Sequence, residues 1–397
     1  MPPPCIRSLS LGGFLSFAPD SARFELQPLN VLIGANGSGK SNVIEALELL
    51  RATPADFAAA IRDGGGPAEW LWKGATKPSP ARIEVELDRC AVTGRPLRYE
   101  LEFAAAQNRV QILDEAITDA SSPAGEPPLP SYYSFGRGNP VINVRDTGSD
   151  SKRVQRKLQL DTLLPDQSVL AQRKDPDLYP ELTWLGQQFG AIQTFRDWTF
   201  GRYAALRLPQ PADLPDHYLL PDARNLALML NQIEHQDPQR LNAMLQRFLP
   251  RFERLSTRVS GGTVQFYLHE HGFSAPIPAT RLSDGTLRFI ALLATLLASA
   301  PPPLVCIEEP ELGLHPDALA LIGELLLEAA TRTQLIVTTH SDALVSALSG
   351  HPDTVLACER PGAGTILRRL DPKQLAIWLD KYRLGDLWRM GELGANP

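Results

Sequence analysis

The spacing of hydrophobic residues changes along the chain and divides it into three segments. After residue 276, short apolar runs alternate with longer stretches in which apolar residues recur at helical spacing. This pattern predicts strands over 304–308, 334–339 and 354–358, and helices over 285–299, 316–330 and 341–349. Strands that alternate with helices in this way favour a parallel sheet with helices on both faces.

The N-terminal segment adds a strand of the same kind. Residues 29–33 form an apolar run that predicts a buried strand, and helical spacing follows over 39–52 and again over 54–62. We expect this strand to join the C-terminal sheet, which would split one α/β domain in sequence. The predicted segments are an N-terminal half over 1–115, an insertion over 116–275 and a C-terminal half over 276–397.

Alternating apolar and polar residues predict antiparallel strands in the part of the chain between the strand at 29–33 and the C-terminal strands. Residues 82–87 and 97–103 alternate in this way and predict a hairpin, and another strand begins at Val110. The insertion should be mixed and mainly helical. Its expected elements are a Pro-, Gly- and Ser-rich zone over 121–150, short strands at 132–135 and 141–144, helices over 221–236 and 237–249, and a strand over 264–268.

Two groups of basic residues lie in the insertion. Arginines recur at spacings of seven, four, three and four, at Arg240, Arg247, Arg251, Arg254 and Arg258. On one continuous helix they would form a basic stripe suited to contacting nucleic-acid phosphates, although Pro250 would break or kink that helix. The shorter basic run over 151–157 is expected to be a solvated loop.

The overall composition is that of a globular protein. Hydrophobic residues make up 43% of the 397 residues and charged residues 21%, which argues against disorder. The formal net charge of −6 argues against a broad basic surface but leaves room for a local basic groove.

The cysteines and the longest apolar run favour a reducing cytoplasm and no membrane association. The four cysteines are far apart and form no C-x-x-C pair, so a zinc site is not expected. The chain starts with no secretion signal, and the longest apolar run, 289–300, is too short to span a bilayer. The cysteines are Cys5, Cys90, Cys306 and Cys358.

The first candidate for chemistry is the segment 34–41, which reads Gly-Ala-Asn-Gly-Ser-Gly-Lys-Ser. It matches the phosphate-binding loop G-x-x-x-x-G-K-S, the Walker A motif, between a predicted strand and a predicted helix. The glycines let backbone N–H groups approach a phosphate, and the helix N-terminus adds partial positive charge. Lys40 would reach the β- and γ-phosphates, and the Ser41 hydroxyl would face Mg²⁺.

The second candidate is a pair of acids at the end of an apolar strand, the Walker B pattern. Glu308 and Glu309 follow the run over 304–307, at the edge of the sheet where ligands bind in α/β folds. Glu308 would hold Mg²⁺ directly or through water, and Glu309 is the candidate general base for an attacking water. His340 ends the strand predicted at 334–339 and could reach the γ-phosphate.

Taken in order, these motifs resemble the ABC-type ATPases, and among them the SMC, RecF and OLD group. The resemblance rests on residues 31–46 (VLIGANGSGKSNVIEA), 282–286 (LSDGT, similar to the family's signature motif), 308–316 (EEPELGLHP) and 338–341 (TTHS). It is strongest for a group of bacterial AAA, SMC-like ATPases, which end in a similar tryptophan-bearing tail (382–394). It covers both ends of the chain well and the middle loosely.

The resemblance implies a P-loop NTPase of the ABC-head type whose ATP sites form between two chains. One chain would hold ATP and Mg²⁺ with its Walker A and B residues and His340, and Ser283 and Gly285 of a second chain would close on the γ-phosphate. ATP would then drive homodimerisation, and hydrolysis would separate the heads. The Walker A residues expected to contact ATP are Gly34, Asn36, Gly37, Ser38, Gly39, Lys40, Ser41 and Asn42.

Three features depart from the family's pattern. The signature has Asp284 in place of a glycine, and we expect this acid to point away from the phosphate. The family's Q-loop glutamine has no clear marker; Gln172 is our candidate metal ligand, with Gln167 as the alternative. Only 57 residues (397 − 340) follow His340, too few for the nuclease domain of OLD proteins, so no nuclease is expected.

Two hypotheses for function follow. In the first, ATP-dependent dimerisation acts on DNA, in repair, chromosome maintenance or defence. In the second, the ATP-bound dimer scaffolds or restrains a partner protein, such as a nuclease or toxin, without binding DNA. A transporter ATPase, a kinase and a GTPase fit the motifs less well.

Overall fold

A computed structural model describes residues 5–74, 79–120, 131–136, 138–145, 153–362 and 364–395. These residues form two compact units. The N-terminal unit comprises residues up to 192 together with 356–369, and the C-terminal unit comprises 193–355 together with the residues from 370 onward.

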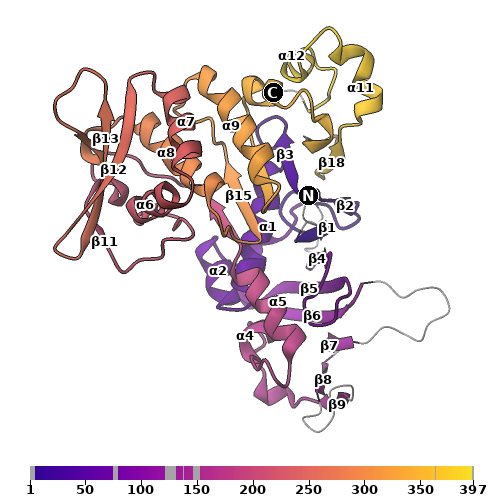
Figure 1. Ribbon diagram of the computed structural model, residues 1–397. Helices are drawn as coiled ribbons and strands as arrows, with labels where there is room; N and C mark the ends of the chain where they lie inside the picture. The colour runs from indigo at the N-terminus through magenta and orange to yellow at the C-terminus, as the bar shows by residue number, and fades with distance from the viewer. Residues whose placement is uncertain are drawn as a thin grey trace. The chain divides into compact units, whose positions relative to one another are not determined.

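An eight-stranded antiparallel sheet is the main feature of the N-terminal unit (Figure 1). Its strand order is β2-β1-β4-β5-β6-β7-β8-β9. The alternation in β5 explains why the sheet forms, because its alternate residues from Leu97 to Phe103 are fully buried. The strands are β1 (Ile6–Gly12), β2 (Phe24–Glu25), β4 (Ala81–Leu87), β5 (Leu97–Ala106), β6 (Arg109–Asp119), β7 (Ser131–Gly136), β8 (Asn139–Arg145) and β9 (Arg153–Lys157).

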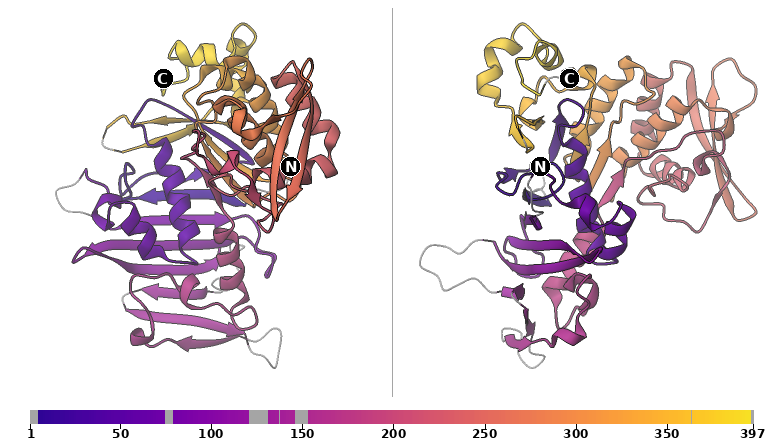
Figure 2. Two further views of the ribbon diagram at one scale, coloured as in Figure 1. Left: turned by 90° about the vertical axis from the view of Figure 1, so that its left-hand side faces the viewer. Right: turned by 180° about the vertical axis from the view of Figure 1, so that it is seen from behind.

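Helices pack against one face of this sheet, as the two views of Figure 2 show. Phe57 from α2 contacts Phe103 of β5 edge-on, and Phe189 from α5 contacts Tyr99 in the same way. These aromatic contacts bury the apolar face that the alternation in β5 creates. The helices are α2 (Phe57–Asp63), α3 (Pro67–Trp70), α4 (Val169–Gln172) and α5 (Pro180–Gly190), with the short 3₁₀ helix η1 (Leu160–Thr162).

A second element of the N-terminal unit carries the glycine-rich loop. Strand β3 (Leu29–Ile33) has all five residues buried and leads through the loop into α1 (Lys40–Ala52). In the strand order, β3 is followed by β17 (Val355–Glu359) and β18 (Ile366–Arg369). The strand and the helix match the elements predicted from hydrophobic spacing.

Three parallel strands lie at the centre of the C-terminal unit: β10 (Gln193–Phe195), β15 (Leu304–Glu308) and β16 (Gln334–Thr338). Helices α8 (Asp284–Leu297), α9 (Pro316–Ala329) and α10 (Asp342–Ala347) connect or follow them, close to the predicted bounds. The remaining elements are η2 (Ala205–Arg207), β11 (Gln210–Pro211), α6 (Leu226–Gln236), α7 (Pro238–Phe248), β12 (Phe252–Ser260), β13 (Thr263–Glu270), β14 (Ile277–Pro278), η3 (Ala279–Arg281), η4 (Pro352–Thr354), α11 (Pro372–Leu379) and α12 (Leu384–Arg389).

The predicted arginine stripe is wrong. The helix ends at Phe248, and Arg254 and Arg258 lie on strand β12. The two arginines that do lie on α7 are ion-paired with α9, since Arg240 contacts Glu328 and Arg247 contacts Glu324. These carboxylates neutralise the face that was expected to bind phosphates.

The basic run over 151–157 also differs from the prediction. Residues 153–157 form β9, an outer strand of the sheet with mostly exposed side chains, and residues 151–152 lie outside the described part of the chain. The solvated character was predicted correctly, but the loop was not.

The helices of the described residues are short. The longest, α8 and α9, have 14 residues each, so the described ranges contain no coiled-coil arm. In the same ranges we find no helix with the length and hydrophobicity needed to cross a membrane.

Candidate nucleotide site

The predicted site residues fall into two groups, one in each unit. The Walker A loop belongs to the N-terminal unit, and the acid pair, His340 and the signature segment belong to the C-terminal unit. We describe each group by itself.

The glycines of the Walker A loop are required by close backbone contacts. Gly34 and Gly39 have φ values of 153° and 103°. A Cβ on Gly34 would lie 2.4 Å from the carbonyl oxygen of Cys358, and one on Gly39 would lie 2.3 Å from Oγ1 of Thr365. Only glycine can therefore occupy these two positions.

The start of α1 fits an anion. Its N-cap residue is Gly39, so no side chain caps the first N–H groups, and the first turn carries no acid. The buried Ser38 Oγ has no hydrogen-bond partner among the described residues. Lys40 is only 6% exposed, and its Nζ donates to the carbonyl oxygens of Gly34 (2.7 Å) and Ala35 (3.0 Å). An uncapped helix start, an unpartnered hydroxyl and a nearby ammonium group together match the needs of a phosphate.

The other predicted Walker A residues differ in their surroundings. Asn36 and Gly37 are exposed at the tip of the loop, and Ser41 is partly buried in the first turn of α1. Asn42 donates from Nδ2 to Ser16 Oγ at 2.7 Å, so its amide supports the loop from behind.

Thr365 holds the loop from the other side. Its Oγ1 lies 2.7 Å from Ser16 Oγ and 2.8 Å from the carbonyl oxygen of Ser38. Sequence reasoning missed Ser16 and Thr365 because they are distant in sequence from the loop and belong to no motif.

The acid pair lies at the carboxyl edge of the parallel strands in the C-terminal unit. Glu308 pairs in register with Thr338, so β15 and β16 end together and bring Glu309 near His340. His340 Nε2 lies 3.7 Å from Glu309 Oε1, and both side chains are about one-third exposed. Glu309 adopts a positive φ of 45°, a conformation that costs a non-glycine residue energy and often occurs at functional sites.

The Glu309 backbone is held on both sides. Its N–H donates to the carbonyl oxygen of Thr338 at 3.0 Å, and its own carbonyl accepts from Arg288 Nη1 at 3.3 Å. These contacts fix the candidate general base at the sheet edge while its carboxylate stays accessible to water.

Arg196 is a candidate site residue that the sequence did not indicate. It follows β10, which pairs in parallel with β15, so both strands end at the same edge. Its Nε donates to Glu308 Oε2 at 2.8 Å. Glu308, the acid that would hold Mg²⁺ according to the resemblance, is therefore paired with an arginine. Any bound metal would have to share Glu308 with Arg196 or displace Arg196.

Glu311 was also missed, although it stands within the quoted EEPE segment. Its Oε1 accepts from Thr339 Oγ1 and from the His340 N–H, both at 2.7 Å. Its buried Oε2 has no partner among the described residues, and burial raises the pKa of the carboxyl. Glu311 thus fixes the backbone of His340.

The signature segment begins α8. Ser283 is the N-cap, and its Oγ accepts from the Thr286 N–H at 3.1 Å. A Cβ on Gly285 would lie 2.6 Å from the carbonyl oxygen of Gly313, so glycine allows the signature to pack against the loop after β15. Asp284 is 67% exposed at its side chain and forms an ion pair with Arg207, which neutralises the acid that departs from the family's pattern.

The two candidate Q-loop glutamines make local contacts in the N-terminal unit. Gln172 accepts from the Leu164 N–H at 2.7 Å and donates to the Gln167 carbonyl at 2.7 Å. Gln167 accepts from the Phe57 N–H and donates to Asp56. A metal would compete with these bonds, and the role proposed for Gln172 stays a prediction.

Comparison with known proteins decides the family. The family described as "AAA domain, putative AbiEii toxin, Type IV TA system" matches residues 29–346, which span both groups of site residues. The chain belongs to this family.

Curated relatives of this AAA-domain chain are chromosome partition proteins. The chain is similar to Smc of Mycolicibacterium paratuberculosis, with 29% identity over 150 residues, covering 37% of this chain and 11% of the relative. It is similar to Smc of Rhodopirellula baltica, with 24% identity over 205 residues, covering 48% and 17%. The chain thus spans less than a fifth of the length of these relatives.

Solved structures show that the AAA-domain chain has the fold of an SMC head, the ABC type of P-loop ATPase. A crystal structure of an Smc head bound to the C-terminal winged-helix domain of ScpA aligns with a TM-score of 0.54 at 13% identity, covering 94% of this chain and 99% of that one. An Smc head with an extended coiled coil, bound to the C-terminal domain of ScpA derived from Pyrococcus furiosus, aligns with a TM-score of 0.56 at 12% identity, covering 95% and 98%.

Proposed function

We propose that this protein is an ATPase. Two copies of the chain dimerise around ATP and separate when the ATP is hydrolysed. The observation that carries the proposal is the Walker A loop, where an uncapped helix start, the unpartnered Ser38 hydroxyl and buried Lys40 converge. The SMC-head fold supports the proposal. The acid pair that ends β15 and the segment that begins α8 supply the groups that hydrolysis and dimerisation would need.

The roles of the residues follow from their chemistry. Lys40 binds the β- and γ-phosphates, and Ser41 and Glu308 are the side chains that would hold Mg²⁺. The metal would neutralise charge on the phosphates when it is bound. Glu309 orients and deprotonates the attacking water, and His340, fixed by Glu311, contacts the terminal phosphate. Ser283 and Gly285 of a second copy complete the site.

We further propose that the ATP-bound dimer acts on DNA. The curated relatives support this proposal because they are chromosome partition proteins. Fluorescence anisotropy of a labelled duplex at low salt, with and without ATP, tests it. An ATP-dependent rise that weakens steeply with added salt is expected, because phosphate contacts release counterions. No rise for duplex or single-stranded DNA would refute DNA binding and leave the ATPase proposal standing.

A second candidate is control of a partner protein, and α11 favours it. None of its residues is buried, and it leaves Ile377 80% and Trp378 43% exposed. Copurification of a partner from nuclease-treated lysate, lost in an Ile377→Ser, Trp378→Ser variant, would support this reading over DNA binding.

The variant Glu309→Gln tests the shared core. It removes the base and keeps the phosphate contacts, so we expect ATP to bind and trap a dimer, measured by light scattering. Lys40→Ala is the control, which should lose ATP binding and stay monomeric. A Glu309→Gln protein that remains monomeric with saturating ATP would contradict the composite site.

A further inference from the structure

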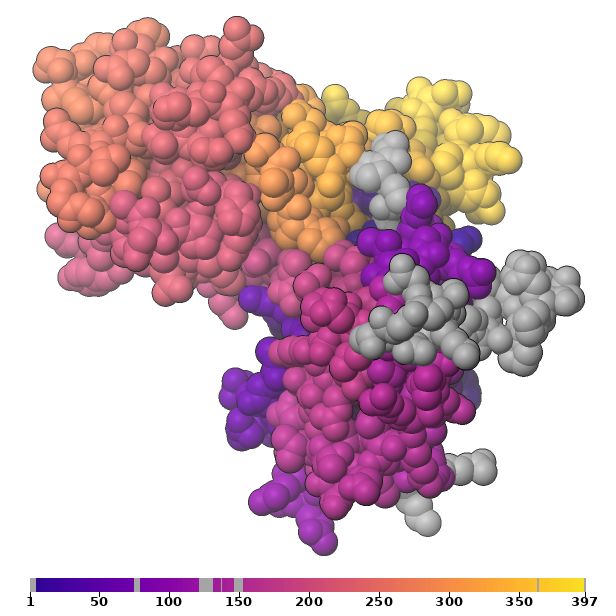
Figure 3. Space-filling model, turned by 60° about the horizontal axis from the view of Figure 1, so that its bottom comes forward, coloured from indigo at the N-terminus to yellow at the C-terminus, as the bar shows by residue number. Residues whose placement is uncertain are grey.

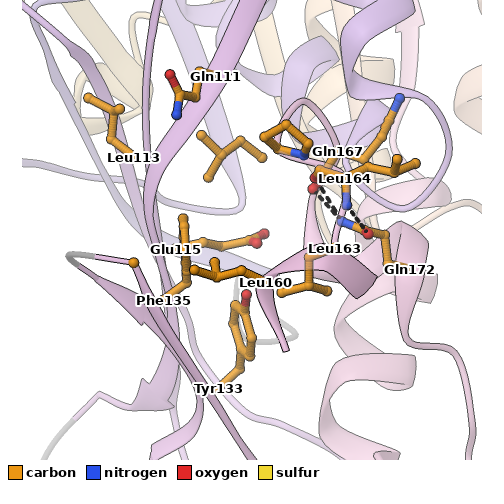
Figure 4. A pocket seen from close by; sticks show the side chains of 13 residues that line it. Gln111, Leu113, Glu115, Tyr133, Phe135, Leu160, Leu163, Leu164, Gln167 and Gln172 are labelled. Carbon is orange, nitrogen blue, oxygen red and sulfur yellow. Dashed lines mark hydrogen bonds between the residues drawn. The ribbon is translucent and has the colours of Figure 1, made fainter. Parts of the chain in front are cut away.

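A cavity of about 510 Å³ lies within the N-terminal unit, away from the Walker A residues in sequence (Figure 4). One wall is the face shared by β6 and β7, where Leu113 and Glu115 lie on one strand and Tyr133 and Phe135 on the other. These side chains share a face because alternate residues of a strand point the same way. The volume falls within the range of small-molecule pockets.

The opposite wall is the leucine-rich segment around η1. Leu160, Leu163 and Leu164 line the cavity, and Leu160 and Leu164 are more than half exposed. In Figure 3 the segment that contains them, in magenta, lies at the surface of this unit. Apolar side chains exposed around a cavity lose unfavourable contact with water when a ligand covers them.

This wall is fixed in place by hydrogen bonds rather than by apolar packing. The Pro165 carbonyl accepts from the Ile112 N–H of β6 at 2.8 Å. Gln172 holds Leu164 at both its N–H (2.7 Å) and its carbonyl (3.2 Å). The cavity is therefore preformed, which reduces the entropy lost when a ligand binds.

The hydroxyl group of a mostly buried tyrosine points into the cavity. Tyr133 is 3% exposed, and in Figure 4 its hydroxyl points into the space between Leu160 and Glu115. No described residue hydrogen-bonds this hydroxyl. Burial raises the pKa of Tyr133, so the hydroxyl stays protonated and can both donate and accept. Because the hydroxyl oxygen is open to the cavity, a ligand or water there can supply its partner.

The charge of the cavity limits the ligand. Among the described residues that line the cavity, Glu115 is the only aspartate, glutamate, lysine, arginine or histidine. Its oxygens already accept from Tyr99, Ser168 and the Val169 N–H. An anion would meet this carboxyl with no lysine, arginine or histidine among the described lining residues, and a cation would find most of the carboxyl's acceptor sites occupied.

We propose that this cavity is a binding site for an uncharged, mostly apolar small molecule that carries one hydrogen-bonding group for Tyr133. The leucine wall and Phe135 bind the apolar body, and the Tyr133 hydroxyl fixes its orientation. The site contains none of the Walker A, acid-pair or signature residues; of the residues proposed for the ATPase site, it includes only the candidate Q-loop glutamines Gln167 and Gln172.

Binding of N-phenyl-1-naphthylamine to the full chain tests the proposal. This uncharged probe has one N–H group, and its fluorescence rises in apolar surroundings. A saturable rise with one site per chain is expected without nucleotide and in the Lys40→Ala protein. 1-Anilinonaphthalene-8-sulfonate, a similar ring system with a negative charge, should bind at least roughly tenfold more weakly.

Two variants and a control locate the probe. Leu163→Trp narrows the cavity and should weaken binding at least about tenfold, whereas Tyr133→Phe keeps the shape, loses one hydrogen bond and should weaken it about fivefold. Ile377→Ala, at an exposed apolar position on α11, should leave binding unchanged. The proposal is overturned if the wild-type protein gives no saturable rise, if neither cavity variant weakens binding, or if Ile377→Ala abolishes it.

Discussion

Arg207 shows how one buried side chain can hold a functional segment. It is 5% exposed, and its guanidinium donates to the carbonyl oxygens of Phe200 (2.8 Å), Ala279 (3.3 Å) and Leu282 (2.6 Å) and pairs with Asp284. Three of these four contacts reach the segment that leads into α8. An arginine from the insertion thus fixes the chain just before the signature.

Replacing Arg207 with Met should destabilise the protein by roughly 3 kcal/mol, because three carbonyl groups lose a charged donor. Denaturant unfolding measures the change. Arg202→Met, at an exposed arginine outside every motif, is the control and should stay within about 0.5 kcal/mol of the parent. Equal effects of the two changes would show that the buried contacts contribute little.

Glu311 gives a prediction about pH. Burial raises the pKa of its carboxyl above the ordinary value of 4.5, so the folded state favours the protonated form. The stability linked to this group is fully present below the ordinary pKa and is lost as pH rises through the raised pKa. Glu311→Gln stays neutral at every pH. The melting temperature of this variant minus that of the parent should therefore increase from acid to neutral pH.

Thermal melts of both proteins across this pH range measure the difference. Glu253→Gln, at an exposed surface carboxyl, serves as the matched substitution. A difference between Glu311→Gln and the parent that does not change with pH would mean that the Glu311 carboxyl is not the titrating group.

At the scale of elements, α8 and the loop after β15 are joined by a backbone contact at Gly285. Because a Cβ there would lie 2.6 Å from the Gly313 carbonyl oxygen, Gly285→Ala must push the two apart. We expect the variant to bind ATP with unchanged affinity but to dimerise at least about tenfold more weakly when combined with Glu309→Gln.

Analytical ultracentrifugation with ATP measures this dimerisation. Gly201→Ala is a suitable control, since a Cβ there meets nothing within 4 Å. If Gly285→Ala dimerises as well as the control, close packing of the signature is not needed for the interface.

The elements that carry the motifs could be predicted because their signals are local. β15 was predicted over the observed bounds, since an apolar run that ends in acids needs no distant information. Arg196 and Arg207 could not be found in this way. They contact residues 112 and 77 positions away, and the pairing of the three-residue strand β10 with β15 brings Arg196 to Glu308. The arginine stripe failed because charge spacing does not reveal that the helix ends and a strand begins.

At the scale of the whole molecule, the proposed dimer has two equivalent sites, each made from two chains. A mixture of Lys40→Ala and Ser283→Arg proteins should therefore recover activity that neither has alone. In a heterodimer, one site combines the intact Walker A loop of one chain with the intact signature of the other. At equal concentrations, at most about half of the wild-type ATPase rate is expected, because each mixed dimer has one good site out of two.

Phosphate release measures the recovered rate. The double variant Lys40→Ala, Ser283→Arg mixed with wild-type protein is the control, because each of the two sites in its mixed dimers contains one changed residue and mixing should add no activity. No recovery in the first mixture would indicate that each chain completes its own site.

The contact of the Walker A loop with Cys358 and Thr365 has a consequence for synthesis. The loop and its helix leave the ribosome early, but the residues that support Gly34 and Gly39 are made more than three hundred positions later. Domains generally form from the N-terminus as the chain grows, yet this loop cannot reach its final geometry until residues 358–365 have been translated. A nascent chain that stops before residue 358 should consequently be unable to capture ATP, and the capacity to assemble into an active pair would arise only after that point.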